Sequence, residues 1–325
     1  MKTIHNLLSE KEGTIIHAPR FETELLLAHA LKKTRAFVLA HPEYPVTKNV
    51  LKTFLSYLEQ RNNHEPIALI TGHKEFYGRE FFVNEHTLVP RPETELLIEK
   101  ILDSIADETL SMQESHEHKK HSTLILDVGT GSGNIITTIA KELELKMSDK
   151  RNFTFIASDL SKEALRIAKK NASRHHVKKN IRFMHSDMLQ KIPKKFFHNA
   201  TSIYIAANLP YLSEKEFQDA PTDVRMFEPK SALESGPDGL NHYRSLFKEL
   251  RALSQKPREA PARITLFLEI SPSQKTPISS LIESVFPNAK QSFFKDLSKK
   301  WRLAHITFVS PSQEKRAIKK EKERE

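Results

Sequence analysis

The chain has 325 residues and contains no cysteine. This absence excludes disulfide bonds, thiolate nucleophiles and cysteine-ligated zinc or iron–sulfur centres. The mean hydropathy is −0.50, and no run of about 18 apolar residues offers a membrane-spanning helix. The first residues, Met1 to Asn6, lack the apolar stretch of a secretory signal. We therefore expect a soluble, cytoplasmic protein without a membrane partner, and we expect it to be monomeric.

Charge is strongly one-sided in one part of the sequence. The net charge of the chain is +10, and residues 141–200 carry fifteen Lys or Arg against six Asp or Glu. Such an excess is typical of nucleic-acid-binding proteins, although much of it falls on segments with amphipathic helical spacing. A solvated helix face and a docking surface for an RNA-rich partner both remain open. Residues 1–72 are nearly neutral, with nine basic and seven acidic side chains.

The hydrophobic pattern divides the chain. Apolar residues at helical spacing predict a helical domain over residues 1–72. Residues 73–91 predict a hairpin linker that turns at Gly78, with a short returning strand at residues 88–89. Pro92 is suited to the first turn of a helix.

Residues 92–310 change to apolar strands that alternate with amphipathic helices. The expected strands are residues 123–128, 153–157, 181–184, 202–206, 264–268, 291–294 and 303–309. This alternation predicts the α/β class, as a doubly wound, Rossmann-like, mostly parallel sheet covered on both faces. We expect the last two strands to form an antiparallel hairpin at the sheet edge. Residues 311–325 predict a charged tail.

Glycine is scarce, with eight in the whole chain. Three of them fall in one strand-to-helix turn, in the sequence Gly129-Thr130-Gly131-Ser132-Gly133. Such a turn allows positive φ angles and the close approach of a ligand to bare backbone. Asn134 stands where the dinucleotide fingerprint needs its third glycine, and the lysine of a phosphate loop is absent. Together with Asp127, the pattern fits the D-x-G-x-G-x-G loop of S-adenosylmethionine-dependent methyltransferases.

Two further strand ends place acidic residues at the same edge of the sheet. Asp159 ends the second strand, where a carboxylate can accept from both ribose hydroxyls of a nucleoside. Asp187 ends the third strand, where it can accept from an adenine amino group while Met188 lies against the ring. Either aspartate alone could be a helix N-cap. Three consecutive strand ends at the ligand-binding edge of an α/β sheet favour a cofactor site.

The fourth strand ends in an Asn-x-Pro-Tyr tetrad, Asn208-Leu209-Pro210-Tyr211. A planar amide or exocyclic amine nitrogen is a poor nucleophile because its lone pair is delocalised. The Asn208 side-chain oxygen and the Leu209 carbonyl can accept its two N–H groups and direct its lone pair toward a methyl donor, while Tyr211 stacks on the planar group. Positioning of this kind lowers a barrier by up to about 7–11 kcal/mol, so no strong base is needed. An Asx-type turn that merely closes the strand is the alternative interpretation.

The sequence therefore supplies a set of candidate site residues. The candidate catalytic residues are Asn208, Pro210 and Tyr211, and Leu209 joins them in binding the substrate. The candidate cofactor-binding residues are Asp127, Gly129, Thr130, Gly131, Ser132, Gly133, Asp159, Asp187, Met188 and Asn208. Four histidines, His116, His118, His121 and His175, lack a paired carboxylate or strand context, so we expect a solvent-exposed linker around residues 113–122 and no metal site.

These motifs resemble those of the protein-(glutamine-N5) methyltransferases of the HemK/PrmC type, which modify the Gly-Gly-Gln glutamine of peptide chain release factors. The similarity runs from about residue 20 to residue 309. It is carried by residues 65–68, 75–78, 88–95, 127–133, 208–211 and 223–229. The resemblance implies a class I methyltransferase domain with S-adenosylmethionine as cofactor. It also implies a helical N-terminal domain that helps to bind the release factor, and methyl transfer to the side-chain amide of its glutamine.

The sequence departs from the family pattern at three places. Leu209 replaces the usual proline of the tetrad, which keeps the carbonyl but loses some rigidity. Ser271 replaces the glycine of a Glu-x-Gly-x-x-Gln motif whose Glu269 and Gln274 are present. Lys299 stands where a glycine is usual. The last two changes affect local backbone shape in peripheral turns.

Two other functions compete with this one. A nucleic-acid adenine-N6 or cytosine-N4 methyltransferase shares the chemistry of the tetrad and would suit the +10 charge. It also predicts a recognition module rich in Arg and exposed aromatics, whereas residues 1–72 are nearly neutral. A non-catalytic cofactor-binding or scaffolding protein is the third possibility, and the intact tetrad argues against it.

Overall fold

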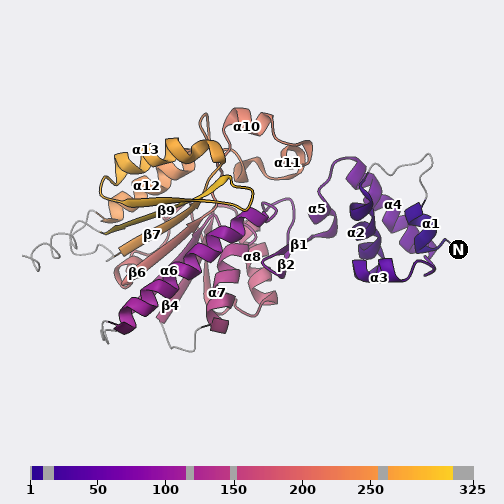
Figure 1. The fold of residues 1–325 in the computed structure, drawn as a ribbon, viewed down its shortest axis with the longest axis horizontal. Helices are drawn as coiled ribbons and strands as arrows, with labels where there is room; N and C mark the ends of the chain where they lie inside the picture. The colour runs from indigo at the N-terminus through magenta and orange to yellow at the C-terminus, as the bar shows by residue number, and fades with distance from the viewer. Residues whose placement is uncertain (1, 10–17, 115–120, 147–151, 255–262, 310–325) are drawn as a thin grey trace, which may run out of the picture.

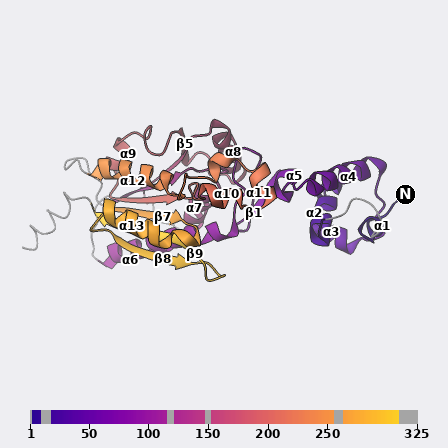
Figure 2. The same ribbon diagram turned by 90° about the horizontal axis from the view of Figure 1, so that it is seen from above.

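The computed structural model describes residues 2–9, 18–114, 121–146, 152–254 and 263–309. Its N-terminal part is a group of short helices, as the sequence predicted. They are α1 (Ile4–Ser9), α2 (Arg20–Leu31), α3 (Arg35–Ala40), α4 (Lys48–Asn62) and α5 (Ile67–Thr71). Both views show α1 to α4 beyond the β1–β2 hairpin, on the side away from the large sheet (Figures 1 and 2). Within the described part of the chain, no helix combines the length and apolar character needed to cross a membrane.

Local signals begin and end these helices. Thr34 and Thr47 are N-caps whose hydroxyls accept from backbone N–H groups in the first turns of α3 and α4. Lys32 ends α2 in the left-handed conformation. The helices bury Leu26 of α2 and Phe54 of α4 in a small core of their own. This part of the chain therefore has its own apolar centre, separate from that of the sheet.

A short antiparallel hairpin follows the helices. Strand β1 (His73–Phe76) pairs antiparallel with β2 (Arg79–Phe82). Tyr77 and Gly78 both have positive φ, as a tight hairpin turn requires. The predicted strand at residues 88–89 was wrong, because the described residues 84–91 hold no strand. The Val89 N–H donates to the Glu228 side chain instead, at 3.0 Å, and Pro90 and Pro92 after it have no N–H to offer a sheet.

The large sheet has seven strands in the order β5-β4-β3-β6-β7-β9-β8. They are β3 (Ser122–Val128), β4 (Asn152–Asp159), β5 (Ile181–His185), β6 (Ser202–Ala207), β7 (Arg263–Glu269), β8 (Lys290–Lys295) and β9 (Trp301–Val309). The first five strands in this order are parallel to one another, while β9 pairs antiparallel with both β7 and β8. The predicted α/β class, the mostly parallel sheet and the antiparallel C-terminal hairpin are confirmed.

Helices cover both faces of this sheet (Figure 1). On one face α6 (Glu95–Glu114), α7 (Asn134–Lys146) and α8 (Lys162–Arg174) share a core with β3, β6 and β7. On the other face α12 (Asn241–Ser254) and α13 (Lys275–Val285) do so. Alternate residues of one strand serve the two cores, with Ile125 on the first face and Leu126 on the second. Both faces of the sheet are therefore buried, and a ligand can approach it at the carboxyl ends of the parallel strands.

Short helical segments complete the carboxyl edge and its surroundings. They are η1 (Pro92–Thr94), α9 (Lys195–His198), α10 (Glu214–Gln218), α11 (Thr222–Phe227), η2 (Lys230–Ala232) and η3 (Pro272–Gln274). The helix expected at Pro92 starts there as η1 and continues as α6.

Candidate active site

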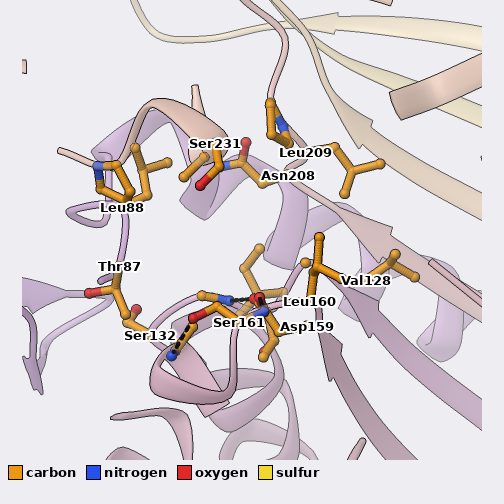
Figure 3. A pocket seen from close by; sticks show the side chains of 18 of the residues that line it. Thr87, Leu88, Val128, Ser132, Asp159, Leu160, Ser161, Asn208, Leu209 and Ser231 are labelled. Carbon is orange, nitrogen blue, oxygen red and sulfur yellow. Dashed lines mark hydrogen bonds between the residues drawn. The ribbon is translucent and has the colours of Figure 1, made fainter. Parts of the chain in front are cut away.

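A cavity of about 350 Å³ lies at the carboxyl ends of the parallel strands. Figure 3 shows Ser132, Asp159 and Ser161 on one side of it, with Asn208 and Leu209 across from them. Most of the predicted site residues line this cavity: Gly129, Thr130, Gly131, Ser132, Asp159, Asp187, Met188, Asn208, Leu209 and Pro210. Segments far apart in the sequence therefore meet at one site, as the strand order requires.

The glycine loop is shaped by close packing on two sides and open space between them. Gly129, Gly131 and Gly133 all have positive φ, at 71°, 54° and 76°. A Cβ on Gly129 would come within 2.9 Å of a methyl group of Leu209, and one on Gly133 within 2.8 Å of the Ala168 Cβ. A Cβ on Gly131 would meet no described atom within 4 Å. Gly131 is thus the point where bare backbone faces the cavity.

Asp159 connects the glycine loop to the start of α8. One carboxylate oxygen accepts from the Gly131 N–H and the other from the Ser161 N–H, both at 2.8 Å. Burial raises the pKa of Asp159, and the backbone N–H donors act in the opposite direction. Ser161 in turn caps α8. Each carboxylate oxygen keeps a second lone pair that a ligand hydroxyl at the cavity edge can reach.

Asp127 lies beneath the loop and does not line the cavity. Its side chain is fully buried, and one oxygen accepts from the Thr130 hydroxyl at 2.6 Å. Burial raises the pKa of Asp127 to about 7. Gly133 also stands back from the cavity, against Ala168 of α8. The structure places both residues where they support the shape of the loop.

Asp187 and Met188 form another part of the lining. Asp187 is exposed, and Met188 is buried with a positive φ of 41°. The Ser186 N–H just before them donates to the Asp159 carbonyl at 3.0 Å, which holds this turn beside the end of β4.

The tetrad sits at the end of β6, and its asparagine is only half satisfied. The Asn208 Nδ2 donates to the Thr94 hydroxyl at 3.2 Å, and that hydroxyl donates to Glu269 Oε2 at 2.6 Å. The Asn208 Oδ1 is buried without a hydrogen-bond partner among the described residues. Burial raises the pKa of Glu269 to about 7. An acceptor without a donor thus stands at the cavity wall.

Tyr211 does not line the cavity. Its hydroxyl donates to Glu269 Oε1 at 3.4 Å, and burial raises its pKa. The Gln274 side chain donates to the Tyr211 carbonyl at 2.8 Å, and the Ser271 N–H donates to Gln274 Oε1 at 3.0 Å. Ser271, which stands where the family usually has glycine, is the N-cap of η3 and forms a capping box with Gln274.

Three residues that hold the cavity wall were not predicted as site residues. Glu228 accepts from the Val89 N–H and pairs with Arg91, so it anchors the wall that contains residues 86–91. Thr94 and Glu228 lie within segments that carried the family resemblance, so the signal was present. Asn171 of α8 had no such signal. Its amide bonds the β2 backbone and donates to the Ser132 carbonyl at 2.8 Å, which ties the hairpin to the glycine loop.

The histidines do not converge in the described residues. His116 and His118 lie outside those residues, and no group of three potential metal ligands occurs within the described ranges. The linker expected around residues 113–122 overlaps described elements at both ends, because α6 runs to Glu114 and β3 begins at Ser122, and residues 115–120 lie outside the described residues. His121 is mostly buried, 3.5 Å from Glu108. His175 contacts the Glu80 carbonyl at 3.0 Å.

Both parts of the chain are similar to known proteins. Residues 3–72 match a family model described as the PrmC N-terminal domain, and residues 119–227 match a methyltransferase domain. The release factor glutamine methyltransferase of Bacillus subtilis is 32% identical over 307 residues, which cover 93% of this chain and 96% of that protein. The one from Nitratidesulfovibrio vulgaris is 35% identical over 238 residues, covering 73% and 72%. This chain belongs to the release factor glutamine methyltransferase family.

Proposed function

We propose that this chain transfers a methyl group from S-adenosylmethionine to the side-chain amide nitrogen, N5, of the glutamine in the Gly-Gly-Gln motif of peptide chain release factors. The observation that carries the proposal is the buried, unpartnered Oδ1 of Asn208 across the cavity from the glycine loop. A buried acceptor without a donor costs about 1–3 kcal/mol, so a ligand N–H in this place would remove that cost. The family membership supports the same substrate.

The residues around the cavity fit S-adenosylmethionine. The volume of the cavity, about 350 Å³, falls in the range of sites for small molecules. Gly131 offers bare backbone, Asp159 offers carboxylate lone pairs for ribose hydroxyls, and Asp187 with Met188 offers an acceptor and an apolar surface for adenine. When bound, this cofactor supplies an electrophilic methyl group on a sulfonium. Because S-adenosylmethionine contains no phosphate group, the site needs no residue that binds phosphate.

Asn208 and Leu209 would hold the glutamine amide. The Asn208 Oδ1 would accept one N–H. The Leu209 carbonyl would accept the other, and the loop hydrogen bonds of the described residues leave this carbonyl without a donor. With both N–H groups held, the nitrogen lone pair is directed out of the amide plane, toward the methyl donor. Positioning of this kind is worth up to about 7–11 kcal/mol.

The proton balance requires no strong base. A bond forms between the amide nitrogen and the methyl carbon as the carbon–sulfur bond breaks. The nitrogen, now carrying a positive charge, is acidic and releases one proton to water. This agrees with a site in which the described hydrogen bonds connect Asn208 to the Glu269 carboxyl only through the Thr94 hydroxyl.

The division of labour along the chain is part of the proposal. Residues 1–72 would help to bind the release factor, residues 73–91 would link the two parts, and residues 92–310 would hold the cofactor. We propose that the enzyme works as a cytoplasmic monomer, with no required contact to nucleic acid. The small net charge of residues 1–72 supports a protein partner for that part.

Mass spectrometry of a release factor after incubation with this chain and S-adenosylmethionine tests the function. We expect one added methyl group on the glutamine of its Gly-Gly-Gln motif. Parallel incubations with DNA and RNA test the nucleic-acid alternative. A methyl group added to the DNA or RNA but not to the release factor would overturn the proposal. Cofactor binding without transfer to any of the three would point to a scaffolding protein.

A further inference from the structure

We propose that Thr94 and Glu269 are positioning residues that hold the Asn208 amide in one orientation, so that the site accepts a carboxamide and rejects a carboxylate. This inference rests on the proposed function, because it concerns the same Asn208. Neither residue lies next to Asn208 in the sequence, and Glu269 does not line the cavity.

The direction of each hydrogen bond follows from the chemistry of the groups. The Asn208 Nδ2 can only donate, so the Thr94 oxygen accepts at 3.2 Å. The single proton of the Thr94 hydroxyl is directed at Glu269 Oε2, at 2.6 Å. If the Asn208 amide were turned over, its Oδ1 would face a Thr94 oxygen that has no proton left to donate. The Glu269 carboxylate therefore fixes which end of the Asn208 amide faces the cavity.

This orientation sets the specificity of the site. With Nδ2 held by Thr94, Asn208 presents its Oδ1, an acceptor, to the substrate. The NH₂ group of glutamine complements that oxygen, whereas a glutamate carboxylate would place an acceptor against an acceptor. Sites built to bond a substrate N–H discriminate strongly against analogues that lack it. Turning the Asn208 amide over would present NH₂ instead and would favour the carboxylate.

The protonation state of Glu269 enters the same argument. The groups that face its carboxyl are Thr94 and Glu93 of η1, Tyr211 after β6, Tyr243 of α12 and Arg302 of β9. Burial, and to a smaller extent Glu93, raise the pKa of Glu269 to about 7. Thr94, Arg302 and Tyr211 act in the opposite direction and lower this pKa. A protonated Glu269 can donate to Thr94, which frees the Thr94 proton to point at Asn208 and allows the turned amide. Turnover should therefore fall as the pH drops through about 7.

Two substitutions at Thr94 separate positioning from packing. Thr94→Val keeps the shape of the side chain and removes the hydroxyl, and we expect kcat for release factor methylation to fall roughly 10- to 100-fold. Thr94→Ser keeps the hydroxyl and should restore kcat to within about threefold of the unaltered chain. Thr138→Val is the matched control, because the Thr138 hydroxyl is buried in α7 and has no partner among the described residues. Calorimetry should show S-adenosylmethionine affinity unchanged in all three variants.

Binding and pH measurements test the orientation itself. The unaltered chain should bind a release factor with the Gly-Gly-Gln glutamine at least about tenfold more tightly than one with glutamate there, and Thr94→Val should narrow this preference. At saturating cofactor, the fall in kcat below pH 7 should disappear in Glu269→Gln.

Each outcome decides between the claims. Normal kcat and normal preference in Thr94→Val, or a Thr94→Ser variant as slow as Thr94→Val, would overturn the positioning role while leaving the proposed function intact. If kcat still falls below pH 7 in a Glu269→Gln variant with normal cofactor affinity, the proposed role of Glu269 is overturned. If the unaltered chain fails to methylate the release factor, the proposed function itself is overturned, and this inference with it.

Discussion

The two sides of the cavity use the same device over very different distances in the sequence. Beneath the glycine loop, the buried Asp127 accepts from the hydroxyl of Thr130, three residues away, at 2.6 Å. Behind the tetrad, the buried Glu269 accepts from the hydroxyl of Thr94, 175 residues away, at 2.6 Å. Burial raises the pKa of both carboxyls to about 7. The proposed cofactor side is thus built locally, and the proposed acceptor side is assembled from distant elements.

The two sides also differ in which groups take part. The glycine loop is held through backbone N–H groups, such as that of Gly131, whose partner Asp159 is 28 residues away. The orientation of Asn208 depends on side chains alone, through Thr94 at a separation of 114 residues. Substitutions on the first side should therefore affect loop shape and cofactor affinity, and substitutions on the second should affect turnover.

The largest effect should come from Asn208→Ala. Removing the acceptor oxygen should lower kcat for release factor methylation by about 100- to 1000-fold, as for the loss of one preorganised hydrogen-bonding group in an active site. Affinity for S-adenosylmethionine, measured by calorimetry, should stay nearly unchanged, because the glycine loop is intact. Near-normal turnover in this variant would break the contrast between the two sides and the mechanism based on two acceptors.

Glycine substitutions should sharpen the contrast from the cofactor side. Gly133→Ala combines a positive φ with a Cβ 2.8 Å from Ala168, so the free energy of unfolding should fall by about 2–4 kcal/mol. Gly78→Ala is the matched control, since its φ of 68° is similar but its Cβ would meet no described atom within 4 Å. It should cost only about 1 kcal/mol. Equal losses in denaturant unfolding would show that packing against α8 does not constrain the loop.

A smaller effect is expected from Asp159→Ala. Its carboxylate orders the Gly131 and Ser161 N–H groups and can bond ribose hydroxyls, so cofactor binding should weaken by about 1.5–3 kcal/mol. Asp187→Ala should cost less, because Asp187 is exposed and its side chain accepts a long hydrogen bond from Gln190, at 3.4 Å. Unchanged affinity in Asp159→Ala, measured by calorimetry, would remove Asp159 from the cofactor site.

Much of the fold could be predicted because its signals are periodic or local. The apolar runs of β3 and β6 are long enough to identify central parallel strands, and the three clustered glycines mark the turn after β3. Helix α3 was not predicted, because it is short and lies between a Thr cap and a proline-rich turn. The strand expected at residues 88–89 failed for a tertiary reason, since Glu228 from α11's C-terminal end takes the Val89 N–H.

The candidate site shows the same division. Asp159 and Asn208 were located from their positions at strand ends, and both line the cavity. Asn171 was missed, because an asparagine within a helix carries no local sign that its amide will bridge a hairpin and a loop 89 and 39 residues away. Tyr211 was expected to stack on the substrate, and its hydroxyl instead contacts Glu269. The stacking role stays a prediction.

The sequence by itself determined the sheet, the glycine loop and the acidic strand ends, because strand periodicity, glycine conformation and strand-end position act over a few neighbouring residues. Only the tertiary structure decided which way the Asn208 amide points, since that depends on one hydroxyl proton of Thr94 and on Glu269 at the end of another strand. Hydrogen-bond direction is a property of groups brought together by folding, and no local pattern encodes it.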